Sequence, residues 1–385
     1  MPDGPDFFDQ RREWSRWKHE ILRRYLPKFA GILGSRHRRI FYVDAFAGAG
    51  TYSKDDVPVP GSPLIAASLG AAIVQANAES NKWPYELHCI NIEPDSHHFL
   101  ELCAATSSYP QSIIQNLHGT FYERLSTILS AVGSHPTLFF LDPFGYKGME
   151  WDTISALAAR ADTAKTELLI NFQATKADRD AGWLDSYNQP ARISFVQSLN
   201  DLMGTDAWQR IYEADLPSGE RHEQLTALYA SSLANLFHGI VARYPVRTMT
   251  GQLKYYVLHV TSHRRGCREM SDVIFRVERE YLGERERAQF DRGRQLTFDE
   301  MLAPPLSPQE TEVQLISRLA EDIYVLGKQH RRITFGAIQD ELAISWFGMV
   351  IARHFREACK LLIRQRRIDR ERESGIEDPT VLTFL

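Results

Sequence analysis

Cysteine is scarce in this sequence, and the cysteines that are present do not form pairs. Four cysteines lie far apart along 385 residues, and none belongs to a C-x-x-C motif; they are Cys89, Cys103, Cys267 and Cys359. This usage favours reduced thiols over disulfide bonds and is typical of a cytoplasmic protein. We therefore expect a cytoplasmic location.

Long apolar runs and a strong net charge are also lacking. No segment approaches the roughly 20 apolar residues that cross a bilayer, and residues 1–20 contain no apolar core of the signal-peptide kind. We therefore expect no membrane association. The formal net charge of −4 neither supports nor excludes nucleic acid as a partner, because a local basic face can lie on a nearly neutral molecule.

What the chain does contain is a regular alternation of strands and helices. Apolar side chains at spacings of three and four predict a helix at residues 10–33. Strands are expected at 40–43, within 85–95, 112–118 and 136–145, and at 166–173, with helices at 62–76, 94–105, 120–132 and 149–160. Such β-α alternation predicts an α/β fold with a doubly wound, mainly parallel sheet.

The connection after the first strand is rich in glycine and proline as far as Gly61. We expect a loop here, followed by a helix that has Ser62 as its N-cap and Pro63 at its first position. The small residues of this loop would allow the backbone to approach a bound ligand closely.

The rest of the chain adds an insertion and a second domain. Residues 174–250 break the alternation and predict a helical insertion at one edge of the sheet, after which 254–262 resumes as a strand covered by a helix at 267–281. The proline-rich run 301–310 predicts a linker. Three helical patterns and two short extended runs then predict a winged-helix domain at 311–385. The expected parts are therefore an N-terminal helical segment (1–36), an α/β domain (37–300), the linker and the winged helix.

Functional residues are expected where the parallel strands end. Open α/β sheets bind ligands beyond the carboxyl ends of their strands, and three strands end in polar or turn-forming residues. The first ends in Asp44, Phe46, Gly48 and Gly50, the second in Glu93, and the fourth in Asp142, Pro143, Phe144 and Gly145. A carboxylate for ribose hydroxyls, glycines for close approach and a polar group beside an aromatic ring together favour a nucleoside-binding site.

The spacing after the glycines favours a nucleoside ligand without phosphates. In a dinucleotide site the helix begins directly at the G-x-G-x-x-G turn. Here the predicted helix begins at Ser62, some twelve residues after Gly50, and Lys54 is the basic residue of the intervening loop. S-adenosylmethionine meets these conditions and is the cofactor that we expect.

The segments "FYVDAFAGAG" and "FLDPFG" resemble motifs I and IV of class I S-adenosylmethionine-dependent methyltransferases, especially those that methylate exocyclic amines of bases. A more specific resemblance is to the three-Cys-motif partner protein (TcmP) family. It is carried by Trp17-Lys18-His19, "YVDAFAGAGTY", "GSPLIAA", "FLDPFGYKG" and "YYVLHVTSHRRG", in this order over most of residues 14–280. The resemblance implies a Rossmann-like class I methyltransferase fold and a partner protein encoded nearby.

The resemblance also implies roles for single residues. Asp44, Phe46, Gly48 and Gly50 would line the methionine end of the cofactor, Glu93 would hold the ribose, and Lys18 would reach the cofactor carboxylate. Gly119 and Thr120 stand where many methyltransferases carry Gly-Asp to meet the adenine amine, with Thr120 in place of the acid. Asp142 and the Pro143 carbonyl would accept hydrogen bonds from a target amine, and Phe144 would stack on a planar substrate. The segment has one proline where the amine-methylating pattern has two.

Basic side chains at two other places could contact a nucleic-acid backbone. Arg264 and Arg265 follow the strand at 254–262, and Arg353, Arg356 and Lys360 lie in the last long helix. A solvated loop explains the first pair equally well, and many winged helices bind protein instead. The adjacent His97 and His98 point to different sides of a helix, so no metal site is expected.

We therefore predict an S-adenosylmethionine-dependent methyltransferase that acts on a nucleic acid. One alternative is a non-catalytic binding module with the same fold that recognises nucleic acid or a partner protein. The other is an enzyme whose substrate is a protein or peptide.

Overall fold

The protein forms two compact units, Met1–His263 and Arg264–Leu385. The division precedes the helix that follows the last strand of the sheet, whereas the sequence places a linker at 301–310, of which residues 301–307 lie outside the described part of the chain. The computed structural model describes residues 5–54, 57–79, 84–143, 145, 148–185, 187–214, 216–248, 251–291, 308–371 and 375–385.

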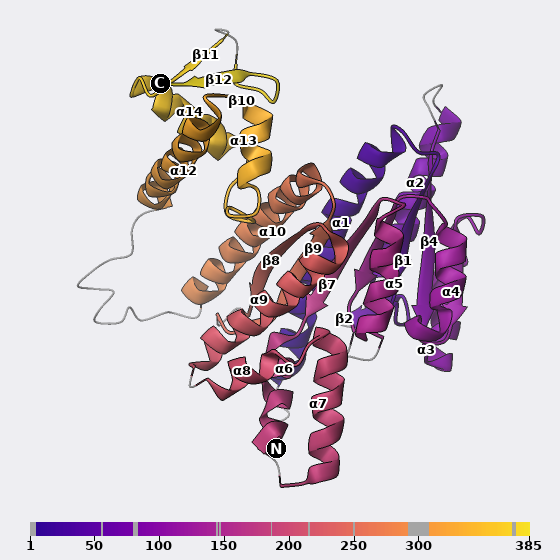
Figure 1. Cartoon of the computed structure of the whole chain (residues 1–385). Helices are drawn as coiled ribbons and strands as arrows, with labels where there is room; N and C mark the ends of the chain where they lie inside the picture. The colour runs from indigo at the N-terminus through magenta and orange to yellow at the C-terminus, as the bar shows by residue number, and fades with distance from the viewer. Residues whose placement is uncertain are drawn as a thin grey trace. The chain divides into compact units, whose positions relative to one another are not determined.

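Within the described residues of the N-terminal unit, seven strands form one sheet (Figure 1). Five of these strands run parallel to one another. In spatial order they are β5 (Ile114–His118), β4 (Glu86–Glu93), β1 (Arg39–Asp44), β6 (Thr137–Leu141) and β7 (Thr166–Phe172). Strand β9 (Leu253–Thr261) pairs antiparallel with β7, and β8 (Ile240–Arg247) pairs antiparallel with β9 at the edge.

The strand order identifies the fold. The first five long strands are arranged 3-2-1-4-5, and the final antiparallel pair inserts its second strand next to the fifth. This mixed, mainly parallel order is typical of the class I methyltransferase Rossmann fold. The prediction of that fold class is confirmed.

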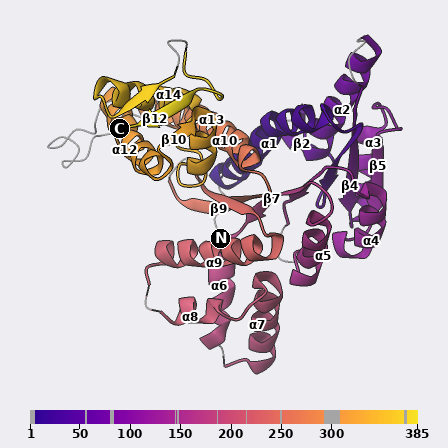
Figure 2. The same cartoon turned by 45° about the horizontal axis from the view of Figure 1, so that its top comes forward.

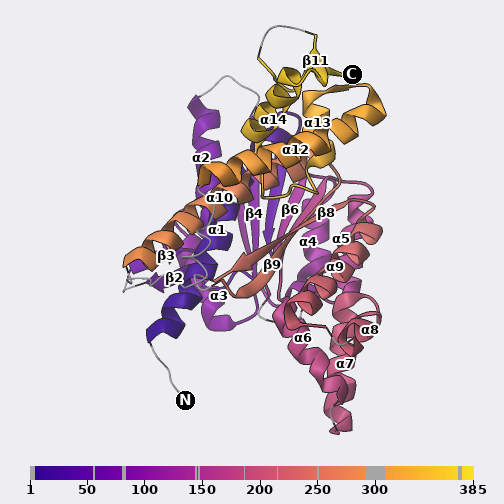
Figure 3. The same ribbon diagram turned by 90° about the vertical axis from the view of Figure 1, so that its left-hand side faces the viewer.

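Helices cover both faces of the sheet, as the apolar character of its strands requires. The helices α1 (Pro5–Gly34), α2 (Ser62–Glu79) and α3 (Ser96–Thr106) lie on one face, and α4 (Phe121–Val132), α5 (Trp151–Ala161) and α9 (Ser218–Phe237) lie on the other (Figures 1 and 3). Alternate side chains of β1, among them Val43, join the core under α4, α5 and α9. The side chains between them, including Asp44, therefore point to the face that carries α1.

The expected loop before Gly61 contains strand pairing instead. Strands β2 (Thr51–Lys54) and β3 (Val57–Pro60) form an antiparallel pair. The predicted cap of α2 is also wrong: the Ile65 N–H donates to the Gly61 carbonyl at 3.0 Å, while the Ser62 hydroxyl hydrogen-bonds to Asp44. Gly61 is thus the residue before the first turn of α2, and the Ser62 hydroxyl binds the buried Asp44 carboxylate.

The predicted insertion is helical but shorter than expected. It holds α6 (Ala174–Ala181), the 3₁₀ turn η1 (Gly182–Asp185), α7 (Gln189–Met203) and α8 (Trp208–Glu213), which gather beside α9 (Figure 2). Residues 240–247, expected to belong to it, form β8 of the main sheet. The strand tolerates Pro245 because an edge position leaves one side of the backbone unpaired.

The C-terminal unit begins with α10 (Arg264–Asp291), so Arg264 and Arg265 lie in a helix and not in a loop. There follow α12 (Pro308–His330), β10 (Arg332–Thr334), α13 (Phe335–Leu342), α14 (Ala352–Arg364), β11 (Ile368–Arg370) and β12 (Val381–Phe384). The described residues of β10, β12 and β11 form a three-stranded antiparallel sheet, and this element order is that of a winged helix.

The last long helix begins later than the sequence suggests. Trp346 and Phe347 precede α14, and both are buried in the core of the C-terminal unit. Among the described residues, no helix combines the length and the apolar character that a membrane span requires.

Candidate active site

The three predicted carboxylates lie at the same edge of the sheet because their strands are neighbours. Strand β1 is flanked by β4 and β6, and Asp44 is in register with Asn91 and Phe140. Glu93 ends β4, and Asp142 directly follows β6. Burial and, to a smaller extent, the charge of Asp142 raise the pKa of Asp44, so these two carboxylates lie close together. The structure therefore brings Asp44, Glu93 and Asp142 to neighbouring strand ends, as the sequence predicts.

Asp44 is fully buried and held by three local donors. Its carboxylate accepts hydrogen bonds from the Tyr42 hydroxyl (3.0 Å), the Phe46 N–H (3.3 Å) and the Ser62 hydroxyl. Burial nevertheless outweighs these bonds and raises the pKa of Asp44 to about 6. Asp44 thus fixes the turn after β1. It also places at the site a carboxylate whose ionisation is unfavourable because it is buried.

The glycines after Asp44 adopt the backbone conformation that the turn requires. Gly48 has φ of 62° and Gly50 has φ of 82°, a region that other residues rarely adopt. A side chain at Gly48 would meet open space, whereas one at Gly50 would lie 3.2 Å from the Leu102 Cδ1 atom. The half-buried Phe46 ring packs 6.4 Å from the Phe121 ring. The turn therefore leaves room beside Gly48, where a ligand can approach the backbone.

Glu93 and Gly119 are joined through the backbone. The Gly119 N–H donates to the Glu93 carbonyl at 3.0 Å, so β4 and β5 end together. The Glu93 carboxylate is largely buried and accepts one bond from the Asp95 N–H at 2.8 Å. This placement suits a ribose-binding carboxylate held on a rigid strand end.

Thr120 has a structural task at this edge. Its hydroxyl accepts the Glu123 N–H at 3.2 Å, and the Glu123 carboxylate accepts the Thr120 N–H at 2.8 Å, which forms a capping box for α4. A role for Thr120 toward adenine stays a prediction, and its side chain is already committed to the helix start.

The centre of the edge is Asp142, which two side chains contact. The Lys18 ammonium group of α1 forms an ion pair with Oδ2 of Asp142, and the Asn171 amide of β7 donates to Oδ1 at 2.9 Å. Burial alone would lower the pKa of Lys18, but the Asp142 carboxylate together with Tyr52 and Asp44 outweighs it, so the pKa is raised above its ordinary value. The family resemblance assigns Lys18 to the cofactor carboxylate. In the structure the Lys18 ammonium group pairs with Asp142 instead.

The neighbouring Pro143 carbonyl has a partner of its own. The Gln173 amide donates to it at 3.2 Å, and Gln173 lies two residues beyond Asn171, where side chains of an extended chain share a face. Phe144, the predicted stacking residue, lies outside the described residues. The sequence analysis missed Asn171 and Gln173, although amides at alternate positions of "NFQ" after an apolar strand were a readable signal.

His19 lies beside this centre without a hydrogen-bond partner for its Nε2 atom within the described residues. Its ring packs 5.2 Å from the ring of Tyr52. Burial, reinforced by the Lys18 charge, lowers the pKa of His19 to about 3, so the imidazole stays neutral. No pattern in the sequence indicates that this histidine is buried.

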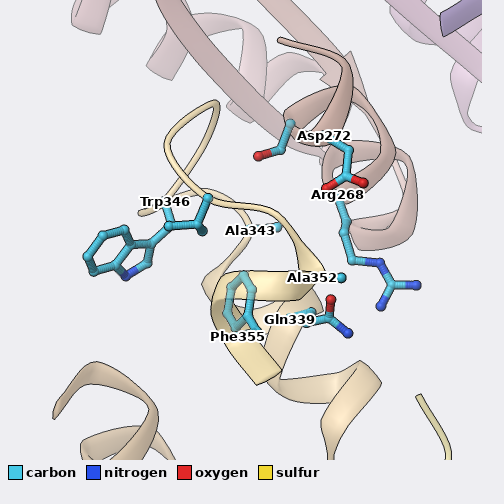
Figure 4. Close-up of a pocket in the computed structure, with 9 residues that line it drawn as sticks. Arg268, Asp272, Gln339, Ala343, Trp346, Ala352 and Phe355 are labelled. Atoms are coloured by element: carbon cyan, nitrogen blue, oxygen red, sulfur yellow. The ribbon is translucent and has the colours of Figure 1, made fainter. Parts of the chain in front are cut away.

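Two hollows lie away from these residues. One of about 340 Å³ lies along α1 and α2 and is lined by Arg23, Leu64 and Tyr109 among others, with none of the predicted cofactor residues. The other, in the C-terminal unit between Arg268, Gln339 and Phe355, has a volume of about 10 Å³ (Figure 4). The second is the size of about one water molecule and cannot hold a nucleoside.

The predicted nucleic-acid contacts are engaged within the C-terminal unit. Four pair with carboxylates: Arg264 with Glu341 (2.6 Å), Arg265 with Glu269 (3.9 Å), Arg353 with Glu312 (2.7 Å) and Lys360 with Glu357 (2.8 Å). Arg356 donates to the Ile376 carbonyl at 3.0 Å. The unit as a whole has 21 basic and 21 acidic residues. The sequence thus located the basic residues, but these carboxylates offset most of their charge.

His97 and His98 lie exposed at the start of α3. No group of three or more metal-ligating side chains occurs in the described part of the chain.

Comparison with known proteins adds only distant similarity. No family model and no curated protein sequence matches the chain. Among solved structures, protein LPL1258 from Legionella pneumophila aligns at 11% identity and a TM-score of 0.33, over 63% of this chain and 84% of its own. The O-methyltransferase TomG from Streptomyces achromogenes, in complex with S-adenosylmethionine, aligns at 12% identity and a TM-score of 0.32, over 64% and 80%. Similarity this low supports neither a fold nor an activity. The fold assignment therefore rests on the strand order itself.

Proposed function

We propose that this protein is an S-adenosylmethionine-dependent methyltransferase that methylates an amine of a planar target, with a nucleic-acid base as the favoured substrate. The observation that supports it is the meeting of the glycine turn after β1 with the paired acceptors Asp142 and Pro143 after β6. The resemblance to the three-Cys-motif partner family, with its implied partner protein, belongs to this proposal. A non-catalytic module and a protein methyltransferase are the alternatives.

The residues present fit the cofactor. Open space beside Gly48 and its positive φ allow close approach to the backbone, and Glu93 offers a carboxylate for two ribose hydroxyls. When bound, S-adenosylmethionine supplies an electrophilic methyl group, which moves to the nitrogen lone pair of the target while the sulfonium becomes a thioether.

The chain itself would orient the target. The Asp142 carboxylate and the Pro143 carbonyl would accept the two N–H groups of an amine, which turns its lone pair toward the glycine turn. Asn171, in β7, and Gln173, just after it, fix these acceptors. This arrangement positions the amine, and the methylated nitrogen then releases its proton to solvent.

Calorimetric titration with S-adenosylmethionine and S-adenosylhomocysteine tests the cofactor site. We expect micromolar binding by the wild type and at least a tenfold loss in Glu93→Ala and Gly48→Asn. Asparagine is preferred to valine at Gly48 because a β-branched residue would add strain at φ of 62°. Gly133→Asn is the control, since Gly133 also has positive φ and open space but ends α4.

Absence of binding by the folded wild type would contradict the proposal. Where binding is found, a labelled-methyl screen over DNA, RNA and protein separates an enzyme from a binding module and names the substrate.

A further inference from the structure

The ion pair between Lys18 and Asp142 balances the charge of the residue that would receive the substrate. Lys18 lies on α1, 124 residues before its partner in sequence. The Lys18 side chain is 14% exposed and that of Asp142 is 20% exposed. Water therefore reaches the pair only in part, and its charges act on neighbours more strongly than those of a surface pair.

Besides Lys18, the side chain that contacts Asp142 carries no charge. Asn171 contacts it through a neutral amide. His19 is buried and neutral beside Lys18. The charge of Asp44 also acts on the pair, but Asp44 is fully buried and its carboxylate accepts bonds from Tyr42, Phe46 and Ser62, so an incoming amine cannot contact it. An incoming group thus meets a carboxylate that keeps free lone pairs while its charge is balanced by a fixed ammonium.

Charged and neutral amines respond differently to such a site. An uncharged amine, such as the exocyclic amine of a nucleobase, needs only acceptors, and an ionised carboxylate has about four lone-pair positions for them. A protonated aliphatic amine would have to approach Lys18 and would be repelled by it. We propose that Lys18 is a specificity-determining residue that selects an uncharged, planar amine and disfavours a protonated aliphatic amine such as a lysine side chain. This inference rests on the proposed function and narrows it.

The test measures binding of two kinds of amine to the protein loaded with S-adenosylhomocysteine. The neutral probes are 2′-deoxyadenosine and 2′-deoxycytidine, and the cationic probe is Nα-acetyl-lysine amide, all followed by ligand-observed NMR titration at pH 7.5. The variants are Lys18→Met, which removes the charge at similar length, and Lys18→Arg, which keeps it.

We expect the wild type and Lys18→Arg to bind a neutral probe at least tenfold more tightly than the lysine probe, and Lys18→Met to lose this preference through a gain for the lysine probe. An equal ratio in wild type and Lys18→Met overturns the inference. The inference is also overturned if the wild type binds the lysine probe at least as tightly as the neutral probes, or if it binds neither kind of probe.

Calorimetry with S-adenosylhomocysteine on the same samples separates the two claims. Binding of this product without discrimination between the amines overturns the inference and leaves the proposed function standing. If the wild type does not bind S-adenosylhomocysteine, the proposed function is refuted. Titration of the unloaded protein with 2′-deoxycytidine and the lysine probe then still shows whether the Lys18–Asp142 ion pair discriminates between neutral and charged amines.

Discussion

His19 shows how a single buried residue links the site to pH. Its pKa is lowered to about 3, whereas an unfolded histidine titrates near 6.5. Below about pH 6.5 the unfolded chain therefore binds a proton that the folded chain does not, and the free energy of unfolding falls as the pH falls toward 3. From pH 7.5 to pH 5 this effect amounts to about 2 kcal/mol.

We expect His19→Gln to remove this dependence. Urea unfolding of wild type and variant at both pH values measures it, and the variant should gain about 2 kcal/mol relative to wild type at pH 5. A difference that stays constant between the two pH values would contradict the burial of a neutral imidazole.

Asp44 explains why the comparison between variants is needed. Its pKa is raised to about 6 by burial, so the folded chain holds a proton that the unfolded chain loses. Stability from this residue falls as the pH rises from about 4 to 6 and is constant above. The two groups oppose each other in the same window, and the pH profile of the wild type alone would hide both.

At the scale of elements, Thr120 separates a structural role from a cofactor role. Loss of its capping hydroxyl in Thr120→Ala should lower the free energy of unfolding by about 1 kcal/mol. The affinity for S-adenosylhomocysteine should change less than threefold, because the hydroxyl is committed to α4. Thr120→Ser keeps the cap and is the control. A tenfold loss of affinity in the stable serine variant would instead support contact with the adenine.

The amide of Asn171, near the end of β7, makes a second element-scale prediction. Asn171→Ala should reduce kcat for the identified acceptor by roughly tenfold to a hundredfold, the worth of one hydrogen bond to a charged group. Affinity for S-adenosylhomocysteine should be unchanged, since Asn171 holds Asp142 and not the glycine turn. Asn200→Ala removes a comparable bond, to the Trp208 ring N–H at 2.9 Å, and should leave kcat intact. Equal effects of both variants would reduce Asn171 to a stabilising residue.

Which elements the sequence revealed follows from their burial. Strands β4, β1, β6 and β7 lie inside the sheet, are largely buried and read as apolar runs, so they were predictable. Strand β5, at the edge, is only partly buried, and its place between two helices in the β-α alternation indicates it. The missed strands of the N-terminal unit are short or lie at an edge: β2 and β3 have four residues each, and proline is present in β3 (Pro58 and Pro60) and in β8 (Pro245). Proline indicates a break in sequence, yet an edge strand tolerates it because one side of its backbone needs no partner.

At the scale of the whole N-terminal unit, the sequence predicted the site residues that follow directly from local strand patterns, but not the contacts that depend on tertiary packing. Asp44, Glu93 and Asp142 could be placed together because parallel strands end at a common edge. The ion pair of Lys18 with Asp142 could not, since it depends on how α1 packs, 124 residues away in sequence. Charge balance at the site is thus a property of the tertiary structure, and it changes which substrates the same carboxylate suits.

The charge balance of the C-terminal unit leads to a prediction about nucleic-acid binding. Counterion release makes affinity fall with salt by about one power of concentration for each phosphate contacted. Four of the five predicted contact residues are paired with carboxylates, so few charges are available for phosphates. For a 12-base-pair DNA duplex, we expect affinity to fall no more than about fourfold between 50 and 200 mM salt, the effect of roughly one contact.

Fluorescence anisotropy measures this dependence, and two variants calibrate it. Glu312→Gln releases Arg353, and Glu321→Gln releases Arg367, which the Glu321 carboxylate otherwise holds through both its oxygens. Each should steepen the salt dependence by about one contact. A wild-type loss of roughly fiftyfold, equivalent to about three contacts, would show that these ion pairs open on nucleic acid. The basic side chains of the C-terminal unit would then bind phosphates, whereas the expected flat response leaves recognition to the proposed amine site at Asp142.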